Sequence, residues 1–266
     1  MQRLTIRSAL FAFALLLGSS FAAADALDEI TDKRVIRFGV SEFAPWTMKT
    51  QSGDLMGFEV DVARKIAADM GVRPEFKVYK WNDIIPALQQ GEIDVIAGGM
   101  SVTPRRALQV NFSRPLATTG INIAVNKEKA RDVERLDQLD DERVIVVAVA
   151  DTMALDVSRN FLPEASLRIA GTAEEAEELL LSNRAHAYLA TEPEVNFLEI
   201  QHPNKVYVPL PAPLMASAEA LAVKRGEQQL LNFLDAWVTA HQTDRWLIAT
   251  RRYWFETMVW SEQAKK

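Results

Sequence analysis

Strand-length and helix-length segments alternate over residues 35–97. Three apolar runs of strand length are separated by two amphipathic stretches, each of which ends at a glycine. The strands are predicted at 35–40, 75–79 and 93–97, and the helices at 58–70 and 83–90. This β-α-β-α-β order predicts a parallel sheet with helices on both faces. Ligands of such sheets bind at the carboxyl ends of the strands, so the residues that follow each strand are the first candidates for a site.

A second set of α/β elements follows Pro115. The predicted strands lie at 121–125, 144–150, 185–190, 206–210 and 221–223. The capping box Thr172-x-x-Glu175 predicts a helix that continues through Leu181, and two more helical stretches lie between residues 227 and 254. The chain therefore carries two α/β units, with no internal repeat and no low-complexity linker.

Composition and charge limit the classes of partner. The chain has 266 residues, of which 48% are hydrophobic, and its formal net charge is −6. Removing residues 1–24 would take away two arginines and no acid, which makes the net charge −8. The charges are spread along the chain and form no basic stripe, which argues against nucleic acid as a partner.

The N-terminal segment has the layout of a secretory signal peptide. Arg3 and Arg7 precede an apolar run over residues 9–17, and three alanines at 22–24 supply an A-x-A cleavage site, so the mature chain is expected to begin at Asp25. A membrane anchor is the alternative, but the run is shorter than the roughly 20 residues that a spanning helix needs. The absence of cysteine excludes both a disulfide framework and a lipid-bearing cysteine. A freely diffusing periplasmic protein is therefore expected.

A candidate anion site follows the strand predicted at 93–97. Gly98 and Gly99 let the backbone approach a ligand closely because neither residue has a Cβ. Thr103 is a good helix N-cap and Pro104 a good first helical residue, which places Arg106 in the first turn of a short helix. Its guanidinium could then bind a carboxylate with two parallel hydrogen bonds.

Five motifs together resemble the polar amino-acid type of periplasmic solute-binding proteins, family 3, which are the receptor components of ABC importers. The motifs are FAPW at 43–46, GFEVDVA at 57–63, WxxIIPAL at 81–88, DVIAGGMSVTPRR at 94–106 and FSxP at 112–115. The resemblance implies an α/β, two-lobed periplasmic-binding-protein fold of type II. Each lobe would be a mainly parallel sheet flanked by helices, and the chain would cross the hinge twice.

The same resemblance implies how the chain is divided between the lobes. Residues 25–118 would form the first part of lobe 1, residues 119–215 would form lobe 2, and residues 216–266 would return to lobe 1. The hinge crossings are expected near residues 118–120 and 211–217.

The resemblance also implies ligand-binding residues in the first lobe. Phe43 and Trp81 would form two aromatic walls, although either ring could instead be core. Trp46 could contact the ligand or pack beneath the loop. Gly99 would donate its backbone N–H, and Ser101 would bond the ligand carboxylate or simply cap a turn. Arg106 is expected to hold the carboxylate, whereas its neighbour Arg105 reads as a surface charge.

In the second lobe the sequence departs from the family. Thr191 stands where amino-acid binders carry the aspartate that pairs with the ligand's ammonium group. A buried cation without a countercharge is costly, so the ligand either lacks an α-amino group or meets another acid. Thr152 and Glu194 complete the expected ligand contacts. The acids that could substitute are Glu42, Asp151, Glu192 and Glu194.

The predicted function is capture of a small carboxylate-bearing solute by lobe closure and its delivery to an ABC permease, with a sensory receptor as an alternative partner. The chain is expected to be a monomer that uses no cofactor and is not an enzyme. His186 lies in a predicted strand, where a lone histidine is more often structural than catalytic, and His202 and His241 have no neighbouring Cys, Asp or Glu at metal-binding spacing. The alternative is a periplasmic enzyme similar to cyclohexadienyl dehydratases, with Glu194 as the acid.

Overall fold

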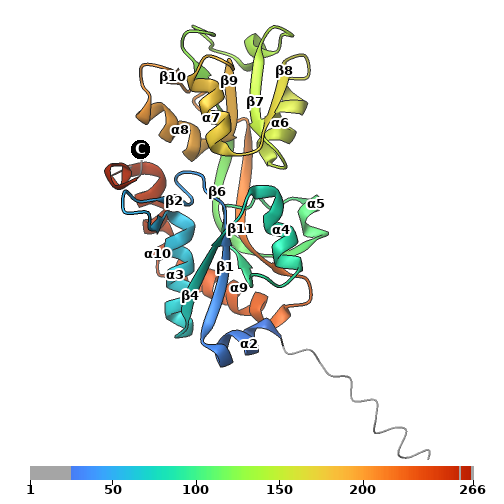
Figure 1. Ribbon diagram of the computed structural model, residues 1–266, viewed down its shortest axis with the longest axis vertical. Coiled ribbons are helices and arrows are strands. Elements are labelled where there is room, and N and C mark those ends of the chain that lie inside the picture. Colours follow the sequence, from blue (N-terminus) through green and yellow to red (C-terminus); the bar gives the residue numbers. More distant parts are fainter. Residues whose placement is uncertain (1–24, 258, 265–266) are drawn as a thin grey trace, which may run out of the picture.

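The computed structural model describes residues 25–257 and 259–264. Two lobes lie one above the other and are joined by two long strands, β6 (Val110–Asn126) and β11 (Met215–Lys224) (Figure 1). The predicted signal peptide, residues 1–24, lies outside the described residues. Within the described ranges no helix has both the length and the apolar character needed to cross a membrane.

The first lobe is built around a parallel core of three strands. β1 (Val35–Val40) pairs in parallel with β4 (Arg73–Val78) on one side and with β5 (Val95–Ile96) on the other. The helices of this lobe are α2 (Ala26–Lys33), α3 (Phe58–Met70), α4 (Trp81–Gln89), α5 (Pro104–Ala107), α9 (Gln228–Thr243) and α10 (Trp246–Arg252). A small hairpin, β2 (Met48–Lys49) with β3 (Leu55–Met56), precedes α3.

The second lobe has its own parallel core. β7 (Ile145–Val149) pairs in parallel with β8 (Ser166–Ala170) and with β9 (Ala187–Thr191). The flanking helices are α6 (Met153–Phe161), α7 (Ala173–Leu181) and α8 (Glu192–Gln201), and β10 (Val206–Tyr207) pairs with β6. Buried side chains cover both faces of β7 and β9, which is why these two strands read as continuous apolar runs, whereas β8 is largely exposed.

β6 and β11 run antiparallel through both lobes and join the two sheets into one. The strand order is β4-β1-β5-β11-β6-β9-β7-β8, so β11 adjoins the first lobe's strands and β6 adjoins the second lobe's. The pairing of β6 with β11 shifts register near Glu219 and again near Ala220. The crossings expected at residues 118–120 and 211–217 fall inside β6 and at the start of β11.

Several elements differ in extent from the sequence-based predictions. β5 pairs only over Val95–Ile96, because Gly98 and Gly99 already belong to the turn that carries the site. The strand predicted at 121–125 is the last third of β6, which begins at Val110 and includes Pro115. α3 has the predicted bounds, since Gly71 adopts a left-handed φ of +68° and closes the helix.

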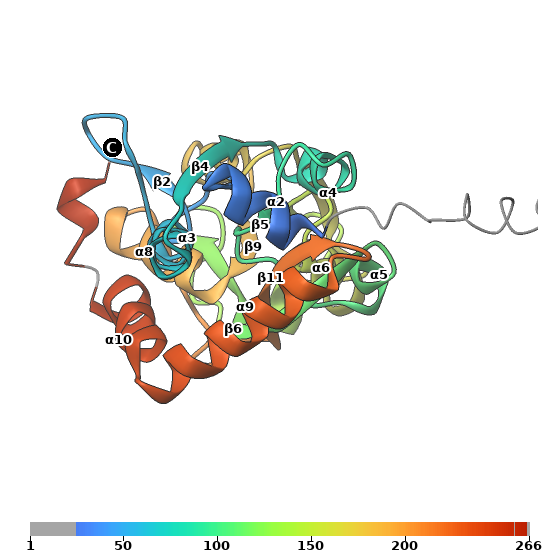
Figure 2. The same ribbon diagram turned by 90° about the horizontal axis from the view of Figure 1, so that it is seen from below.

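The end of the chain completes the first lobe. Seen from below, α9 runs diagonally across this lobe beside α2, and α10 follows it (Figure 2). The Asp25 carboxylate caps α2 and also accepts hydrogen bonds from the backbone of Gln229 and Leu230 at the start of α9. Trp254 and Trp260 are buried in the first-lobe core, where they contact each other.

Candidate ligand-binding site between the lobes

A short helix at the carboxyl end of β5 presents Arg106. Thr103 caps α5, since its hydroxyl accepts a 3.2 Å hydrogen bond from the Arg106 backbone N–H, and Pro104 is the first helical residue. This is the predicted local geometry, and it directs the Arg106 side chain toward the second lobe.

The Arg106 guanidinium is buried and has only backbone oxygens as partners. The residue is 5% exposed. Nη1 donates to the Ser101 oxygen at 2.9 Å, and Nη2 donates across the lobe boundary to the Asp151 oxygen at 2.7 Å. Among the described residues no carboxylate is bonded to it; the charges of Asp156 and Asp151 act on it from farther away, and burial outweighs them and lowers the pKa of Arg106 to about 10. A buried cation with no directly bonded carboxylate is a strong attractor for an anion.

Trp81 lies against this guanidinium. The centre of its ring is 5.4 Å from the Arg106 Cζ atom, which is a cation–π distance. The indole N–H of Trp81 also donates to the Asp151 oxygen, at 3.2 Å. Two first-lobe side chains therefore converge on one second-lobe carbonyl group. Asp151 adopts a left-handed φ of +57°, which belongs to the tight turn before α6.

The aromatic residues form a contiguous cluster. The ring centres of Phe43 and Trp81 are 6.1 Å apart, edge to face, and Phe43 lies equally far from Trp46. Phe43 and Trp81 thus contact each other directly. Trp46 is fully buried against Phe58 and Phe255, so it belongs to the core.

Ser101 and Gly99 already have protein partners. The Ser101 hydroxyl accepts a 2.8 Å hydrogen bond from the Ser217 hydroxyl. The Gly99 N–H, expected to face the ligand, instead donates to the Glu59 carboxyl group at 2.9 Å. This differs from the prediction because Glu59, in the first turn of α3, offers the amide a buried carboxyl acceptor.

The second-lobe candidates lie at the ends of β7 and β9. The Thr152 hydroxyl caps α6 and donates to the Val149 oxygen at 2.7 Å, so its hydrogen-bonding capacity serves the turn. The Thr191 hydroxyl accepts a 3.3 Å hydrogen bond from the Trp46 indole N–H across the lobe boundary. Glu194 is buried and accepts a hydrogen bond from the Tyr188 hydroxyl. Burial, together with the charge of the nearby Glu177, raises the pKa of Glu194 to about 8.

The four acids that could take the role of the missing aspartate at position 191 lie in different parts of the structure. Glu42 forms a surface ion pair with Lys49 at 2.5 Å. Glu194 faces Tyr188 in the second-lobe interior. Asp151 is exposed beside Arg106, and Glu192 begins α8.

Sequence reasoning missed three residues that hold this region together. Glu59, Ser217 and Glu219 are each at most 2% exposed, and they contact the Gly99–Ser101 segment. A signal was available for Glu219, because a single acid inside the apolar run ASAEALAV is unusual for a buried strand. The backbone oxygen of Asp151 could not have been found from residue types at all.

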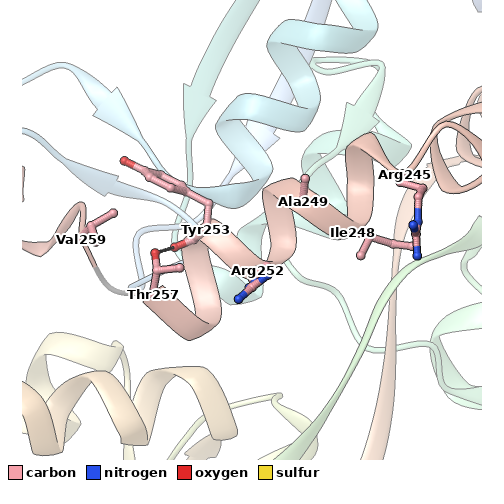
Figure 3. Close-up of a pocket in the computed structure, with 7 residues that line it drawn as sticks. All are labelled: Arg245, Ile248, Ala249, Arg252, Tyr253, Thr257 and Val259. Atoms are coloured by element: carbon pink, nitrogen blue, oxygen red, sulfur yellow. Dashed lines mark hydrogen bonds between the residues drawn. The ribbon is translucent and has the colours of Figure 1, made fainter.

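The histidines and a surface groove on α10 lie away from this region. The Nδ1 atom of His186 accepts a hydrogen bond from the Ile145 backbone, and His241 lies between two aspartates, Asp69 and Asp244. In the described residues no group of three or more His, Asp or Glu side chains is arranged so that it could hold a metal ion. A groove on the outer face of α10 is lined by Arg245, Ile248, Ala249, Arg252, Tyr253, Thr257 and Val259 (Figure 3).

Residues 36–257 match the family model of the bacterial extracellular solute-binding proteins, family 3. The chain belongs to this family. It is 30% identical over 226 residues to the glutamine-binding protein of an ABC transporter from Bacillus subtilis, a match that covers 83% of this chain and 81% of that protein.

A second curated relative of this family-3 protein is an enzyme. The cyclohexadienyl dehydratase of Pseudomonas aeruginosa is 23% identical over 251 residues, covering 93% of each chain. Among solved structures, a reconstructed ancestral amino-acid-binding protein described as a precursor of that dehydratase has a TM-score of 0.81. It is 30% identical, and the match covers 87% of this chain and all of the other.

The match to other curated family members is partial. For three of them the chain spans 47% to 63% of the relative's length. The family match and the structural neighbours together establish the family and the two-lobed fold of this chain.

Proposed function

We propose that this family-3 protein captures a small carboxylate-bearing solute between its lobes and delivers it to an ABC permease. The observation that carries the proposal is the buried Arg106 guanidinium, whose partners are the backbone oxygens of Ser101 and Asp151. A ligand carboxylate would take the place of the Asp151 oxygen and would supply the missing negative charge.

The two lobes contribute different parts of the site. The first lobe supplies Arg106, the Ser101 hydroxyl and the Phe43 and Trp81 rings. The second lobe supplies the Asp151–Thr152 turn and the Thr191–Glu194 segment. Since the ligand would bind the closed arrangement more tightly than an open one, it would shift the balance toward closure. We assign Gly99 to loop support because its N–H is already bonded to Glu59.

The ligand either lacks an α-ammonium group or finds its countercharge away from position 191. Thr191 is neutral and accepts from Trp46, and Glu42 is paired with Lys49. The candidate ligands therefore include deaminated acids and other organic acids as well as amino acids. The chain would act in the periplasm as a monomer.

A thermal-shift screen tests the proposal. The purified chain from Asp25 onward is heated with amino acids, their deaminated analogues and small carboxylates, each at several concentrations. A ligand present at 100 times its Kd adds about 2.7 kcal/mol to the free energy of unfolding. If no carboxylate raises the melting temperature while an uncharged solute does, the carboxylate assignment is wrong.

A second candidate function is dehydration by Glu194. The observation that favours it is the raised pKa of this buried carboxyl group, about 8, which keeps it protonated at neutral pH as a general acid must be. Turnover of prephenate or arogenate by the purified chain tests this alternative. Activity that is present in the wild type and lost in Glu194→Gln would establish an enzyme in place of a transport receptor.

A further inference from the structure

Helix α8 of the second lobe has two buried apolar faces. Val195 and Leu198 are three residues apart, and therefore on one side of the helix, and both lie in the second-lobe core. Phe197 points about 100° around the helix axis from Leu198. It is 5% exposed and belongs to the core cluster of the first lobe. α8 therefore joins the cores of both lobes, and the proposed binding of a solute does not use Phe197.

Phe197 packs against Trp260, which lies near the end of the chain. The centres of the two rings are 4.8 Å apart, and Trp260 is fully buried. The end of the chain lies just below α8 in Figure 1. Aromatic pairs at such a separation stabilise a structure beyond the area that they bury. Separation of the lobes at this edge would expose apolar surface of both rings to water, which is unfavourable.

Hydrogen bonds attach Trp260 to the first lobe. Its indole N–H donates to the Trp254 oxygen at 2.8 Å, and the Trp254 indole N–H donates to the Asp61 carboxyl group on α3, also at 2.8 Å. Farther along the chain, the Gln263 oxygen accepts a 3.2 Å hydrogen bond from the Gln51 N–H, in the turn between β2 and β3. Trp260 should therefore move with the first lobe when the lobes separate.

The start of α8 carries the second-lobe part of the candidate site. Thr191 is the N-cap of α8 and Glu194 lies in its first turn, and the Thr191 hydroxyl accepts from the Trp46 indole N–H. Trp46 packs against Phe255, with ring centres 4.5 Å apart, in the same first-lobe cluster as Trp260. α8 is thus hydrogen-bonded to the first lobe at its start and packed against it farther along the helix.

We propose that Phe197 and Trp260 form a lobe-closing contact that does not depend on the ligand, and that both are positioning residues for the Thr191–Glu194 segment. The inference rests on the proposed function, since it takes this segment to lie over a bound solute. The contact favours the closed arrangement in the free chain. A solute that binds this arrangement then meets a larger competent fraction of the protein, so its apparent affinity rises by a factor that is independent of its chemistry.

The test measures the distance between the lobes in the ligand-free chain. Because the chain contains no cysteine, two introduced cysteines can be labelled without competition. Leu108 in the first lobe and Ile169 on β8 are exposed, so Leu108→Cys and Ile169→Cys carry a donor and an acceptor dye for single-molecule energy transfer. In this background we expect Phe197→Ala to raise the population with the longer distance, relative to the closed population, about threefold or more.

Leu198→Ala is the matched control, because it truncates the next residue of α8 on the face that packs within the second lobe. It should lower the urea midpoint of unfolding and leave the lobe distances unchanged. Phe197→Leu removes the ring but keeps apolar volume, so it should shift the distances in the same direction by less. This variant decides the matter if Phe197→Ala does not fold. Unchanged distances in the folded Phe197 variant, or an equal shift in Leu198→Ala, would overturn the proposal.

Ligand affinity gives a readout that distinguishes positioning from direct contact. Phe197→Ala should weaken the two best carboxylates of the thermal-shift screen by the same factor, about threefold or more, because it changes only the closed fraction. Calorimetry on both carboxylates measures this factor. A loss confined to one of them would place Phe197 at the ligand and would overturn its role as a positioning residue.

The lobe distances separate this inference from the proposed function, since they are measured without a ligand. A wild type that binds no carboxylate, while Phe197→Ala still opens the lobes, refutes the ligand and leaves the lobe-closing contact standing. A wild type that binds a carboxylate, with lobe distances and affinity that Phe197→Ala does not change, refutes the lobe-closing contact alone.

Discussion

The Arg106 guanidinium donates a 2.7 Å hydrogen bond across the lobe boundary to the backbone oxygen of Asp151. A carbonyl oxygen is a weaker partner for a buried cation than a carboxylate, because it carries only a partial charge. The position of the Asp151 oxygen is therefore where a negatively charged ligand group would form its strongest hydrogen bond. The same contact connects Arg106 to the turn before α6.

Replacing Arg106 tests this relationship directly. We expect Arg106→Ala to weaken binding of the best carboxylate from the screen thirtyfold or more, since truncating one partner of a buried charged pair costs about 2–5 kcal/mol. Isothermal titration calorimetry measures the loss. The adjacent, exposed Arg105→Ala is the matched control and should bind as the wild type does. A loss of less than about threefold in Arg106→Ala would remove this residue from the site.

Trp81 is expected to contribute to carboxylate affinity through two contacts. Its ring packs against Arg106, and its N–H donates to the Asp151 oxygen. Trp81→Phe keeps a ring and removes the N–H, whereas Trp81→Ala removes both, so affinity should fall in that order. Urea unfolding measures the stability of each variant. A folded Trp81→Ala protein with wild-type affinity would assign this residue to packing.

Substitution of Phe43 should mainly lower ligand affinity, whereas substitution of Trp46 should mainly lower the stability of the fold. Trp46 is 0% exposed, so Trp46→Ala should cost about 3–5 kcal/mol in the free energy of unfolding. Phe43 is half-buried beside Trp81, and Phe43→Ala should lower affinity while the protein stays folded. Urea unfolding and calorimetry on both variants measure the two effects. Equal destabilisation by both substitutions would place Phe43 in the core as well.

Thr191→Asp should reverse the ligand preference. It restores an acid beside Trp46, so a ligand without an amine should bind about tenfold more weakly, while ordinary amino acids should gain. The uncharged Thr191→Asn is the control for size. The prediction fails if the wild type binds a standard amino acid tightly and that affinity survives Glu42→Gln, Asp151→Asn, Glu192→Gln and Glu194→Gln.

Because of Glu194, the folded protein should be more stable at mildly acidic pH than at neutral or alkaline pH. The pKa of this carboxyl is about 8 in the folded chain against 4.5 ordinarily, so the folded state binds the proton more tightly than the unfolded state does. The free energy of unfolding should therefore fall as pH rises between these two values, by about 1.4 kcal/mol per pH unit for one proton. Urea unfolding at several pH values should show a smaller slope in Glu194→Gln. An unchanged slope would contradict the assignment.

The sequence predicted the local elements better than the contacts between lobes. α3 and the Thr103–Pro104 start of α5 were predictable because a glycine, a cap and a proline mark their ends. β6 was predicted only in part, because Pro115 and Gly120 interrupt the apolar pattern of a strand that continues through both. Periodicity describes neighbours in the chain and cannot show that one strand serves two lobes.

At the candidate site, too, local structure was predicted better than long-range contacts. The register of Arg106 with its motif placed it at the start of a helix, and the structure has it there. The Gly99 amide was assigned to the ligand, because nothing in the residue type reveals that Glu59, forty residues earlier, supplies its acceptor. Long-range partners of backbone atoms depend on the assembled fold.

The position of β11 in the chain has a consequence for the order of folding. β11 is the strand next to β5 in the first lobe, yet it comes after every element of the second lobe. During synthesis, the second lobe's strands β7, β8 and β9 can pair as soon as they emerge. In the first lobe, β5 lacks its neighbour β11 until the last fifty or so residues are made, and the contact of Asp25 with the start of α9 also waits for Gln229. A chain truncated before β11 should therefore retain a folded second lobe, which is formed by the middle of the chain. Its first lobe, which is formed by the beginning of the chain, should not be folded.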